Sequence, residues 1–386
     1  MRVRLVSGLT DPMGAVVHSL SVAERLATMG HDAEVWAPRA VGAVIGGVTR
    51  PRVRVTRDAA GAGDAAARAE AAVRALAAEL RGAPPADVNH AQDAVAAAAL
   101  MRLRAEGLCG PVVRTVHHVD VHGDPALDEM QRASIQDVDS LLCVSAFWAE
   151  RLRAEYGVEA TVVANGVDGR RFGGPGPGRE AAGARFGWGD RATVLALGGV
   201  SRRKGSRVLL EAFARARTRL GEGALLVIGG TGDAADEGYL SGFADDARRL
   251  GLRVAGPRPP RDAAVALLGP VPAGEMPALF HASDALAYPS TREGSGLAVL
   301  EAAMAGLPAV VSDLPVLQES LCDGRDCLMV PAGHSGALAD ALVRLVRDAA
   351  LRARLAAGGR LTAARFAWAD AARAHARLYS GLLAPV

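Results

Sequence analysis

Two glutamates frame a glycine-rich string that runs from Tyr288 to Glu301 and reads Y-P-S-T-R-E-G-S-G-L-A-V-L-E. A strand is expected to end as this string begins, and a helix is expected to start near Leu297. Free N–H groups at the start of a helix attract anions, and Gly294 and Gly296, on either side of Ser295, let a ligand approach the backbone closely. The string therefore favours a site for a diphosphate.

Glu301 is expected on the inward face of this helix, which Leu297, Leu300 and Met304 mark by their spacing. A carboxylate buried there needs partners, because burying it unpaired costs several kcal/mol. Two vicinal hydroxyls, such as those of a ribose, would satisfy both of its oxygens, and Glu293 in the turn is placed to reach a sugar hydroxyl. The alternative is that Glu301 pairs with an arginine while Glu293 is a solvated loop charge.

A basic loop, L-G-G-V-S-R-R-K-G at 197–205, lies between another expected strand and helix. Doubly wound sheets bind ligands at the carboxyl ends of their strands, so this loop and the turn at Glu293 are expected to share one site. Arg203 and Lys204 would neutralise a diphosphate. A solvated basic loop is the alternative, but Lys204 is the only lysine among 44 basic residues, which favours function. A third glycine-rich loop at 228–233 is a weaker signal and is also explained by a tight turn.

The elements that position these loops form alternating apolar runs and amphipathic stretches, which is typical of βα units with parallel sheets. In the first half, strands are expected at 3–7, 33–37, 52–55, 87–91, 112–117, 141–145 and 161–164, and helices at 15–29, 65–80, 94–106 and 146–156. In the second half, strands are expected at 193–197, 225–228, 264–268, 286–288 and 309–312, and helices at 207–219, 235–250, 275–282, 297–305, 335–356 and 365–383.

The predicted fold class is α/β with two Rossmann-like domains. The first domain is expected at 1–172, a linker rich in glycine and proline at 173–189, and the second domain at 190–365. The last helix, within 366–386, is expected to return to the first domain. A chain of 386 residues suits two domains of roughly 150–200 residues each.

The string E-G-x-G-L-x-x-x-E, followed by A-x-A-G-x-P, resembles the retaining glycosyltransferases of family 4. The likeness extends over nearly the whole chain. It includes D-P-M-G ending at Gly14, T-V-H ending at His117, a V-S element ending at Ser145, and V-V-A-N-G-V-D at 162–168. The resemblance implies the GT-B fold, in which two domains face each other across a cleft and the second domain holds the donor.

The resemblance also implies roles for individual residues. Glu293 would contact the donor sugar and Glu301 the ribose, Arg203 with Lys204 would hold the diphosphate, and His117 would lie near the reacting sugar. The remaining donor-binding residues expected from the matching motifs are Gly14, Gly199, Gly294, Ser295, Gly296 and Leu297.

Three positions depart from the family pattern. Gly199 stands where the family usually has an arginine, and Arg203 is inferred to substitute for it. Ser295 replaces a frequent aromatic residue, and Gly14 lacks the second glycine commonly beside it.

Histidines and acidic residues of the first half suggest other sites. His18 and His90 are candidates for acceptor contacts, with a surface or core histidine as the alternative for His18. The run H-H-V-D-V-H at 117–122 could suggest a metal site, but alternation along an extended segment sends neighbours to opposite sides. Asp137-Val138-Asp139 stands before a strand, where a solvated helix end is expected. No metal and no cofactor are expected.

Composition and charge exclude several classes of binding partner. The net charge of +2 is spread along the chain, which argues against nucleic acid, and no segment predicts a membrane span or a signal peptide. The four cysteines lack C-x-x-C spacing, so a reduced cytoplasmic protein is expected, with peripheral membrane contact left open.

The predicted function is metal-independent transfer of a hexose-type sugar from a UDP- or GDP-sugar to a hydroxyl acceptor. Retention by front-face displacement is the expected mechanism, since no carboxylate stands where a covalent intermediate would need it. A nucleotide-sugar epimerase or hydrolase of the same fold and a non-catalytic scaffold subunit are the alternatives. Donor base, sugar, acceptor and oligomeric state have no signature in the sequence.

Overall fold

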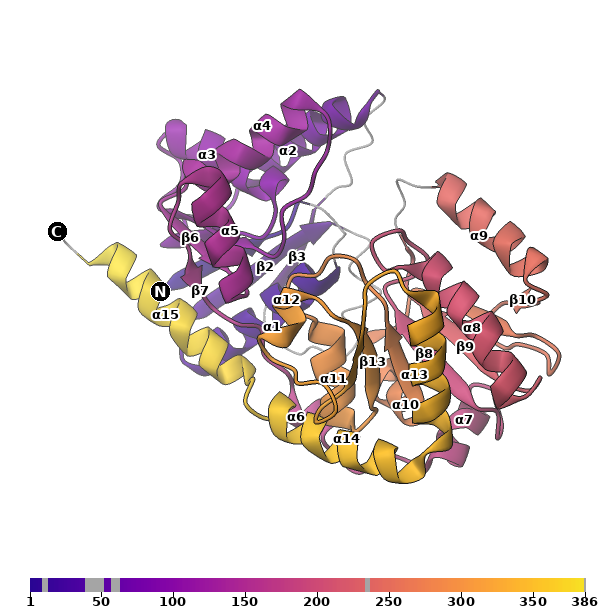
Figure 1. Cartoon of the computed structure of the whole chain (residues 1–386). Coiled ribbons are helices and arrows are strands. Elements are labelled where there is room, and N and C mark those ends of the chain that lie inside the picture. Colours follow the sequence, from indigo (N-terminus) through magenta and orange to yellow (C-terminus); the bar gives the residue numbers. More distant parts are fainter. Residues whose placement is uncertain (9–12, 39–51, 57–62, 233–236, 385–386) are drawn as a thin grey trace. The chain divides into compact units, whose positions relative to one another are not determined.

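The computed structural model describes residues 1–8, 13–38, 52–56, 63–232 and 237–384. These residues divide into two compact units, Met1–Gly166 with Ala367–Val386, and Val167–Phe366. Each unit is built around its own parallel sheet (Figure 1).

The first unit holds a seven-stranded parallel sheet in the order β3-β2-β1-β4-β5-β6-β7. Its strands are β1 (Arg2–Val6), β2 (Asp32–Pro38), β3 (Arg52–Thr56), β4 (Val88–Ala91), β5 (Val112–Val116), β6 (Ser140–Cys143) and β7 (Thr161–Val162). The helices are α1 (Met13–Thr28), α2 (Ala65–Arg81), α3 (Ala94–Ala105), α4 (Pro125–Gln136), α5 (Ala146–Tyr156) and α15 (Trp368–Leu383). Strands such as β5, which is buried along its whole length, form the interior of this sheet.

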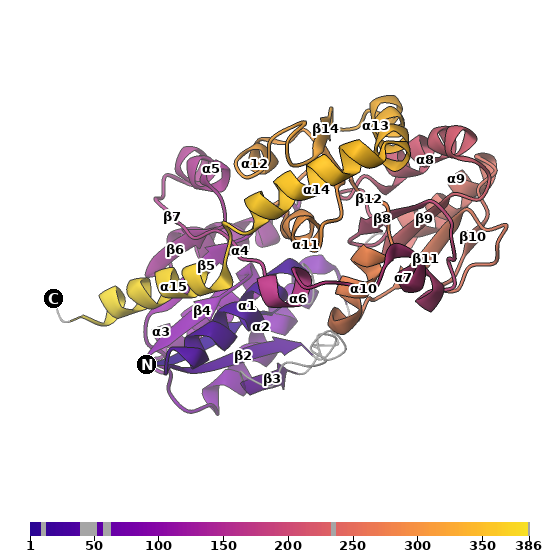
Figure 2. The same cartoon turned by 90° about the horizontal axis from the view of Figure 1, so that it is seen from below.

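Helices cover both faces of the first sheet. On one face α2, α3 and α4 pack against one another over an apolar cluster that includes Leu76, Leu100 and Leu103. On the other face α15 packs along α1, as Figures 1 and 2 both show. The return of the last helix to the first domain, expected from the sequence, is therefore present.

The second unit holds another seven-stranded parallel sheet, in the order β10-β11-β9-β8-β12-β13-β14. Its strands are β8 (Thr193–Leu197), β9 (Leu225–Gly229), β10 (Val254–Ala255), β11 (Val265–Gly269), β12 (Ala285–Tyr288), β13 (Ala309–Ser312) and β14 (Leu328–Val330). The helices are α6 (Gly169–Phe172), α7 (Arg179–Arg185), α8 (Ser206–Leu220), α9 (Glu237–Arg249), η2 (Ala273–Glu275), α10 (Met276–His281), α11 (Leu297–Ala305), α12 (Pro315–Gln318), α13 (Ser335–Arg347) and α14 (Ala349–Ala363).

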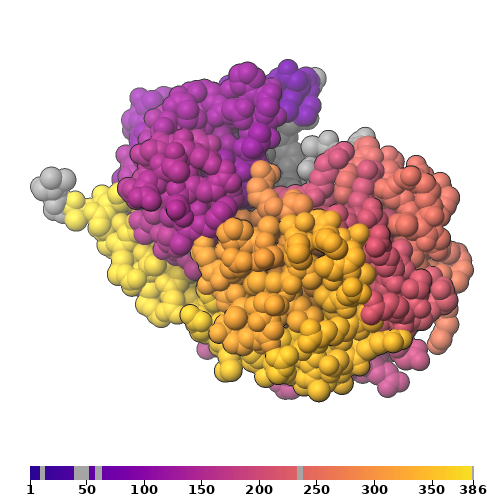
Figure 3. All heavy atoms as spheres, viewed as in Figure 1, coloured from indigo at the N-terminus to yellow at the C-terminus, as the bar shows by residue number. Residues whose placement is uncertain are grey.

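The core of the second unit lies between its sheet and helices α8, α9 and α13. Phe213 of α8 and Phe243 of α9 are fully buried there, with Leu342 of α13. Helix α14 packs on α11 and α13. Figure 3 shows that the orange-to-yellow part of the second unit, which includes α13 and α14, forms one face of this unit, whereas the yellow atoms of α15 belong to the first unit.

The expected boundary at residue 172 and the expected linker at 173–189 both fall inside the second unit. Phe172 is buried, with its ring centroid 5.7 Å from that of Phe280. Arg179 of α7 pairs with Asp284, with a guanidinium-to-carboxylate distance of 2.9 Å. These contacts join the segment to the second sheet, because an aromatic ring and a paired charge both need partners when they leave water.

The helix expected at 335–356 is two helices, because Asp348 interrupts it. Its backbone is extended, at φ −96° and ψ 96°, and its N–H bonds to the carbonyl of Arg344 at the end of α13. Its side chain accepts a hydrogen bond from the N–H of Leu351 and so caps the start of α14. The expected ranges contain no counterpart of strands β10 and β14 or of helices α4, α6, α7 and α12.

Candidate functional site

The second sheet has a topological switch point between β8 and β12. Strands β9, β11 and β10 extend the sheet from one side of β8, while β12, β13 and β14 extend it from the other. The loops that follow β8 and β12 therefore leave the carboxyl ends of adjacent strands and diverge, which creates the usual ligand position of such sheets. These two loops contain the predicted basic residues and Glu293.

The two loops are joined through their backbones. The N–H of Thr291 donates to the carbonyl of Arg203 at 2.9 Å. Gly205 has φ +66°, and a Cβ there would lie 2.2 Å from the carbonyl oxygen of Pro289. Only glycine fits this approach, so the K-G pair of the basic loop is what allows Lys204 to reach the second loop.

Lys204, Arg203 and Glu293 meet in this site. The Lys204 Nζ lies 2.6 Å from Glu293 Oε1, and an Arg203 guanidinium nitrogen lies 3.5 Å from the same oxygen. Burial by itself would raise the pKa of Glu293, but Lys204 and then Arg203 more than offset it and hold that pKa below its usual range. Glu293 is ionised at neutral pH, and the three groups together carry one net positive charge.

Tyr288 adjoins this charged group, although no role was expected for it from the sequence. Its hydroxyl lies 3.1 Å from Lys204 Nζ, which also stands 4.6 Å from the centroid of its ring. Burial, and then the charge of Glu293, raises the pKa of Tyr288 well above its usual range, so the phenol stays protonated. Tyr288 thus holds Lys204 by both a hydrogen bond and a cation–π contact. Its only sequence signal is its place at the end of an apolar strand.

A small hollow opens beside this group within the second unit. Its lining includes Leu197, Gly199, Lys204, Ile228, Tyr288 and Ser290. The hollow lies at the ends of β8, β9 and β12, so it occupies the switch point itself.

Glu301 lies on α11 and is half-buried. Burial raises the pKa of Glu301 to about 7, although the charge of Arg171 opposes the rise. Its carboxylate forms no hydrogen bond or ion pair with any residue in the ranges that the structure describes. The alternative in which Glu301 simply pairs with an arginine is therefore not what the structure has. A half-buried carboxylate with no protein partner is suited to accept hydrogen bonds from a ligand.

The amino end of α11 offers backbone donors. Gly296 is its N-cap, with φ +70° and no side-chain cap, and a Cβ there would lie 2.5 Å from the side chain of Leu317. The N–H groups of Leu297 and Ala298 bond to no residue that the structure describes. Gly294 and Ser295 precede them in the same turn and are half-buried. Free N–H groups and the positive helix end suit an anion.

The structure explains why Gly199 departs from the arginine of the family pattern. Gly199 has φ +70° and is buried, and a Cβ there would lie 1.9 Å from the backbone nitrogen of Gly232. The approach is also close from the other loop, because a Cβ added at Gly230 would lie 2.5 Å from the nitrogen of Gly199. The loop after β8 and the loop after β9 thus interlock backbone to backbone. An arginine at 199 is excluded in this arrangement, and Arg203 is the second cation that lies beside Glu293, at 3.5 Å. Asp233, at the end of the third glycine-rich loop, lies outside the described residues.

His117 follows β5 in the first unit and is buried. Its Nε2 lies 2.9 Å from Oε1 of Gln92, which follows β4. Burial, then the neighbouring His118 and His90, lowers the pKa of His117 to about 3, so its imidazole is neutral. Gly14 lies in the first turn of α1 with open space around it. The residues just before it, Asp11 and Pro12, are outside the described ranges.

His18 and His90, the predicted acceptor residues, are fully buried in a histidine cluster. We define this cluster as His18, His90, His117 and His375. His18 Nδ1 lies 2.8 Å from Asn165 Oδ1, and its ring centroid lies 5.0 Å from that of His117. Both ring nitrogens of His90 are bonded, to the Tyr379 hydroxyl at 2.6 Å and the Thr115 hydroxyl at 2.8 Å. His90 therefore has no ring nitrogen left for an acceptor and serves the packing of α15 instead.

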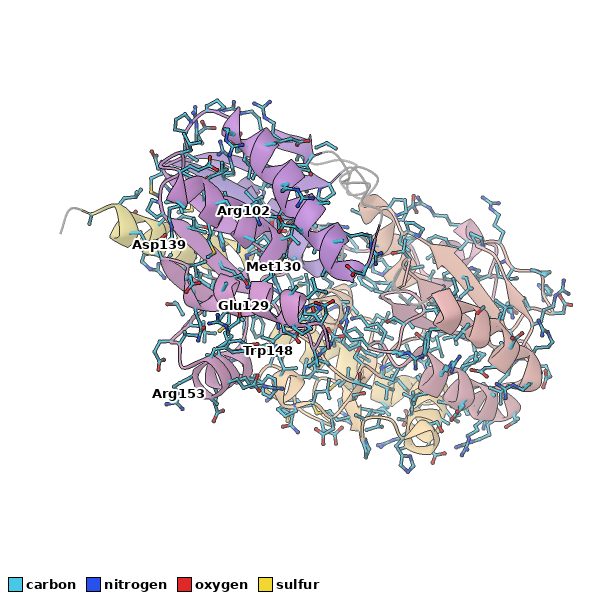
Figure 4. All side chains as sticks on the ribbon, turned by 90° about the horizontal axis from the view of Figure 1, so that it is seen from above. Arg102, Glu129, Met130, Asp139, Trp148 and Arg153 are labelled. Atoms are coloured by element: carbon cyan, nitrogen blue, oxygen red, sulfur yellow. The ribbon has the colours of Figure 1, made fainter. Side chains whose placement is uncertain are left out.

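The other polar motifs of the first unit have structural partners. His118 pairs with Asp120 at 3.2 Å, and Asp124 caps α4 through the N–H groups of Ala126 and Leu127. No group of three or more His, Cys, Asp or Glu in the described ranges could hold a metal ion. Asp139 of the D-x-D motif, labelled in Figure 4, pairs with Arg104 and accepts the N–H of Val112 at 2.8 Å. Arg104 also donates to the carbonyl of Asp137 at 2.8 Å, so the motif is tied to the last turn of α3.

Sequence comparisons match both units. Residues 12–171 match the model described as Glycosyltransferase Family 4, and residues 191–348 match Glycosyl transferases group 1. The glycogen synthase of Mycobacterium tuberculosis is 30% identical over 307 residues, which cover 76% of this chain and 68% of that protein. The chain belongs to glycosyltransferase family 4. The D-inositol 3-phosphate glycosyltransferase of Stackebrandtia nassauensis is 33% identical over 306 residues, 77% of this chain. The chain spans 62% of the length of that relative.

Solved structures show that this member of the family has the GT-B fold. The Anabaena protein HepE, solved with UDP and glucose, superposes with a TM-score of 0.78 at 19% identity, covering 98% of this chain and 99% of that one. Sucrose-phosphate synthase from Thermosynechococcus elongatus gives a TM-score of 0.78 at 19% identity, over 99% of each chain. Among the described residues, no helix has the length and apolar character that crossing a membrane requires.

Proposed function

We propose that this chain is a glycosyltransferase that moves a sugar from a nucleoside-diphosphate sugar to a hydroxyl acceptor. The proposal rests on one observation: a charged cluster and a carboxylate without a protein partner lie at the same edge of the second sheet. Lys204 and Arg203 gather on Glu293 at the β8/β12 switch point, while Glu301, on the helix that follows, has no protein partner among the described residues. A diphosphate needs the first site and a ribose needs the second.

Positively charged groups and N–H donors bind one part of the nucleotide sugar, and carboxylates that accept hydrogen bonds bind the other parts. Lys204, Arg203 and the N–H groups at the start of α11 receive the diphosphate, and Glu301 accepts hydrogen bonds from the ribose hydroxyls. Glu293, held ionised beside Lys204, accepts from a hydroxyl of the transferred sugar. As the bond to the sugar breaks, negative charge grows on the leaving diphosphate, and the same cations stabilise it. This stabilisation needs no metal ion.

Transfer with retention by a front-face step is part of this proposal. The acceptor hydroxyl approaches from the side that the diphosphate leaves, and a leaving oxygen takes its proton as the new bond to the sugar forms. Inositol phosphate is the acceptor to test first, because a 33% identical relative is named a D-inositol 3-phosphate glycosyltransferase. UDP-glucose is the first donor, since a structural neighbour was solved with it.

The test combines nucleotide binding with product analysis. Thermal stabilisation by UDP, GDP, ADP and TDP, with and without EDTA, identifies the base and any metal requirement. Incubation of the matching nucleotide sugar with inositol 3-phosphate should release the nucleotide and form a glycoside, whose anomeric configuration NMR assigns. Glu301→Gln should weaken nucleotide binding about 10-fold, as expected for a lost charge-assisted pair of hydrogen bonds. Glu211→Gln, an exposed glutamate of α8, is the matched control.

The outcomes separate the proposal from its rivals. Nucleotide release without a glycoside in any acceptor mixture would support a hydrolase. Interconversion of the sugar without an acceptor would support an epimerase. Absence of stabilisation by all four nucleotides would overturn the donor site and favour a scaffold subunit.

A further inference from the structure

Gln92 has an unusual environment at the switch point of the first sheet. Strands β2 and β3 extend that sheet from one side of β1, and β4 to β7 extend it from the other, so the reversal falls between β1 and β4. Gln92 directly follows β4, and its N–H donates to the carbonyl of Val6 at the end of β1 at 2.9 Å. Its side chain is thus fixed at the edge where open parallel sheets bind ligands.

The side chain of Gln92 has one bonded end and one free end. Only 3% of the residue is exposed. Its Oε1 lies 2.9 Å from His117 Nε2, whereas its Nε2 is buried without a hydrogen-bond partner among the residues that the structure describes. A buried amide N–H without a partner costs free energy, so the side chain keeps its contact with His117 despite that cost.

The bond to Gln92 constrains the proton on His117. A neutral imidazole has one N–H donor and one bare nitrogen, and a carbonyl oxygen accepts only from the donor. Because His117 is neutral and buried, a carbonyl facing Nε2 places the proton on Nε2 and leaves Nδ1 bare. A bare Nδ1 accepts a hydrogen bond from a hydroxyl, whereas a protonated one cannot.

We propose that Gln92 is a positioning residue that sets the tautomer of His117 with Nε2 protonated, so that Nδ1 accepts a hydrogen bond from a substrate hydroxyl. The bare Nδ1 of His117 then favours a hydroxyl-bearing substrate at the same strand edge. The catalytic consequence rests on the proposed function, but the tautomer does not.

The first measurement is therefore independent of activity. Nitrogen-15 NMR of the full chain reports which imidazole nitrogen of His117 carries the proton, with the signals assigned by their loss in His117→Asn. In the wild-type protein Nε2 is expected to be protonated and Nδ1 bare. Gln92→Met, which keeps the size but removes the amide, should abolish this single form. Gln92→Glu, which still accepts from Nε2, should keep Nε2 protonated.

Gln131→Met is the matched control. Gln131 is a second buried glutamine of the first unit, but its amide bonds to the backbone of Asp120 and contacts no histidine ring. Its substitution should leave the tautomer of His117 unchanged. A protonated Nδ1 in the wild-type protein, or an unchanged tautomer in Gln92→Met, would overturn the proposal.

Kinetics then test the consequence. Gln92→Met should lower kcat about 3- to 10-fold, the effect of one lost neutral hydrogen bond, while the KM for the nucleotide sugar stays within 2-fold. A rise of the donor KM with unchanged kcat would contradict the assigned role. If the wild-type chain transfers no sugar, the proposed function fails, yet the NMR result still decides whether Gln92 sets the tautomer.

Discussion

Lys204 Nζ lies 2.6 Å from Glu293 Oε1, so the chain's only lysine is paired with a carboxylate that is 7% exposed. This pair joins the loop after β8 to the loop after β12 without any ligand. The charges of these two loops are therefore already organised in the protein, with Arg203 3.5 Å from the same oxygen. In the proposed function, such preorganisation would let the loops stabilise a leaving diphosphate without rearranging.

Lys204→Met should reduce stability and nucleotide affinity together. Removing Lys204 leaves the buried carboxylate of Glu293 with only the more distant Arg203, and about 3 kcal/mol of unfolding free energy should be lost. Affinity for the nucleoside diphosphate should fall about 10- to 100-fold, the range of a charged hydrogen bond. Urea unfolding and calorimetric titration measure the two quantities.

A double substitution separates these effects. Lys204→Met combined with Glu293→Gln removes both charges, so stability should recover while affinity stays low. Arg248→Met is the control, because Arg248 pairs with Asp245 at an exposed surface and should change stability by less than about 1 kcal/mol. Full recovery of affinity in the double variant would show that Lys204 does not bind the phosphates.

Gly199 should tolerate no side chain, including the arginine that the family pattern has at this position. Its φ of +70° is unfavourable for any residue with a side chain, and a Cβ there would lie only 1.9 Å from the nitrogen of Gly232. Gly199→Ala should cost at least about 2 kcal/mol of unfolding free energy, and Gly199→Arg more. Gly223→Ala, with nothing within 4 Å of its Cβ, should be neutral in the same urea measurement. A Gly199→Arg variant of normal stability and tighter nucleotide binding would refute this account of Arg203.

Much of the fold could be predicted because local signals agree with the final structure. Helix α5 has the predicted bounds, since Ser145 caps its start and Gly157, at φ +69°, ends it. Helix α11 is likewise bounded by Gly296 and Gly306, both with positive φ. The error at Asp348 arose because the apolar spacing continues across the break while the cap depends on local backbone geometry.

The site could be predicted where its residues share a local motif, or where doubly wound topology brings strand ends together, as it does for Lys204 and Glu293, 89 positions apart. The E-G-x-G-L-x-x-x-E string places Glu293 and Glu301 on one turn and helix. In contrast, His90 and Tyr379 are 289 positions apart in the sequence, and no local pattern predicts their contact. The interlock of Gly199 with Gly232 and the bond of Gln92 to His117 also depend on which strands become neighbours. These contacts follow from sheet order, which sequence spacing does not specify.

Glu301 should make both stability and nucleotide binding depend on pH near 7. Its folded pKa, about 7, lies above its unfolded value, so its stabilising contribution is present below about pH 4.5 and is lost as pH rises through 7. Glu301→Gln should therefore stabilise the nucleotide-free protein by about 1–3 kcal/mol at pH 8.5 and hardly at all at pH 4.5.

Binding should show the opposite trend. The ionised carboxylate accepts from two ribose hydroxyls, so affinity for the nucleotide should rise from pH 6 to pH 8 and level off above that. Glu301→Gln should flatten this part of the profile, whereas Glu211→Gln should keep it. A pH profile that is identical in wild type and Glu301→Gln would exclude Glu301 as its source.

The histidine cluster should make the first unit sensitive to acid. Burial, the largest cause for each, lowers the pKa of His18 and His90 well below their usual range, that of His117 to about 3 and that of His375 to about 4. In the unfolded chain these groups take up protons near pH 6.5, whereas in the folded chain they stay neutral. Stability is therefore complete above pH 6.5 and is lost as pH falls towards 4.

Each buried imidazole should contribute a slope of about 1.4 kcal/mol per pH unit in this interval, and the four together about 5. His375→Gln should lower the slope by about one such contribution, while His122→Asn, at an exposed position, should leave it unchanged. Urea unfolding at several pH values measures the slope. Hydrogen exchange, corrected for its intrinsic pH dependence, measures the protection of α15 at the same pH values. Because His375 and Tyr379 hold α15 on this cluster, α15 should lose its protection first as the pH falls. Equal slopes in wild type and His375→Gln would mean that His375 takes up its proton over the same pH range in the folded and the unfolded protein.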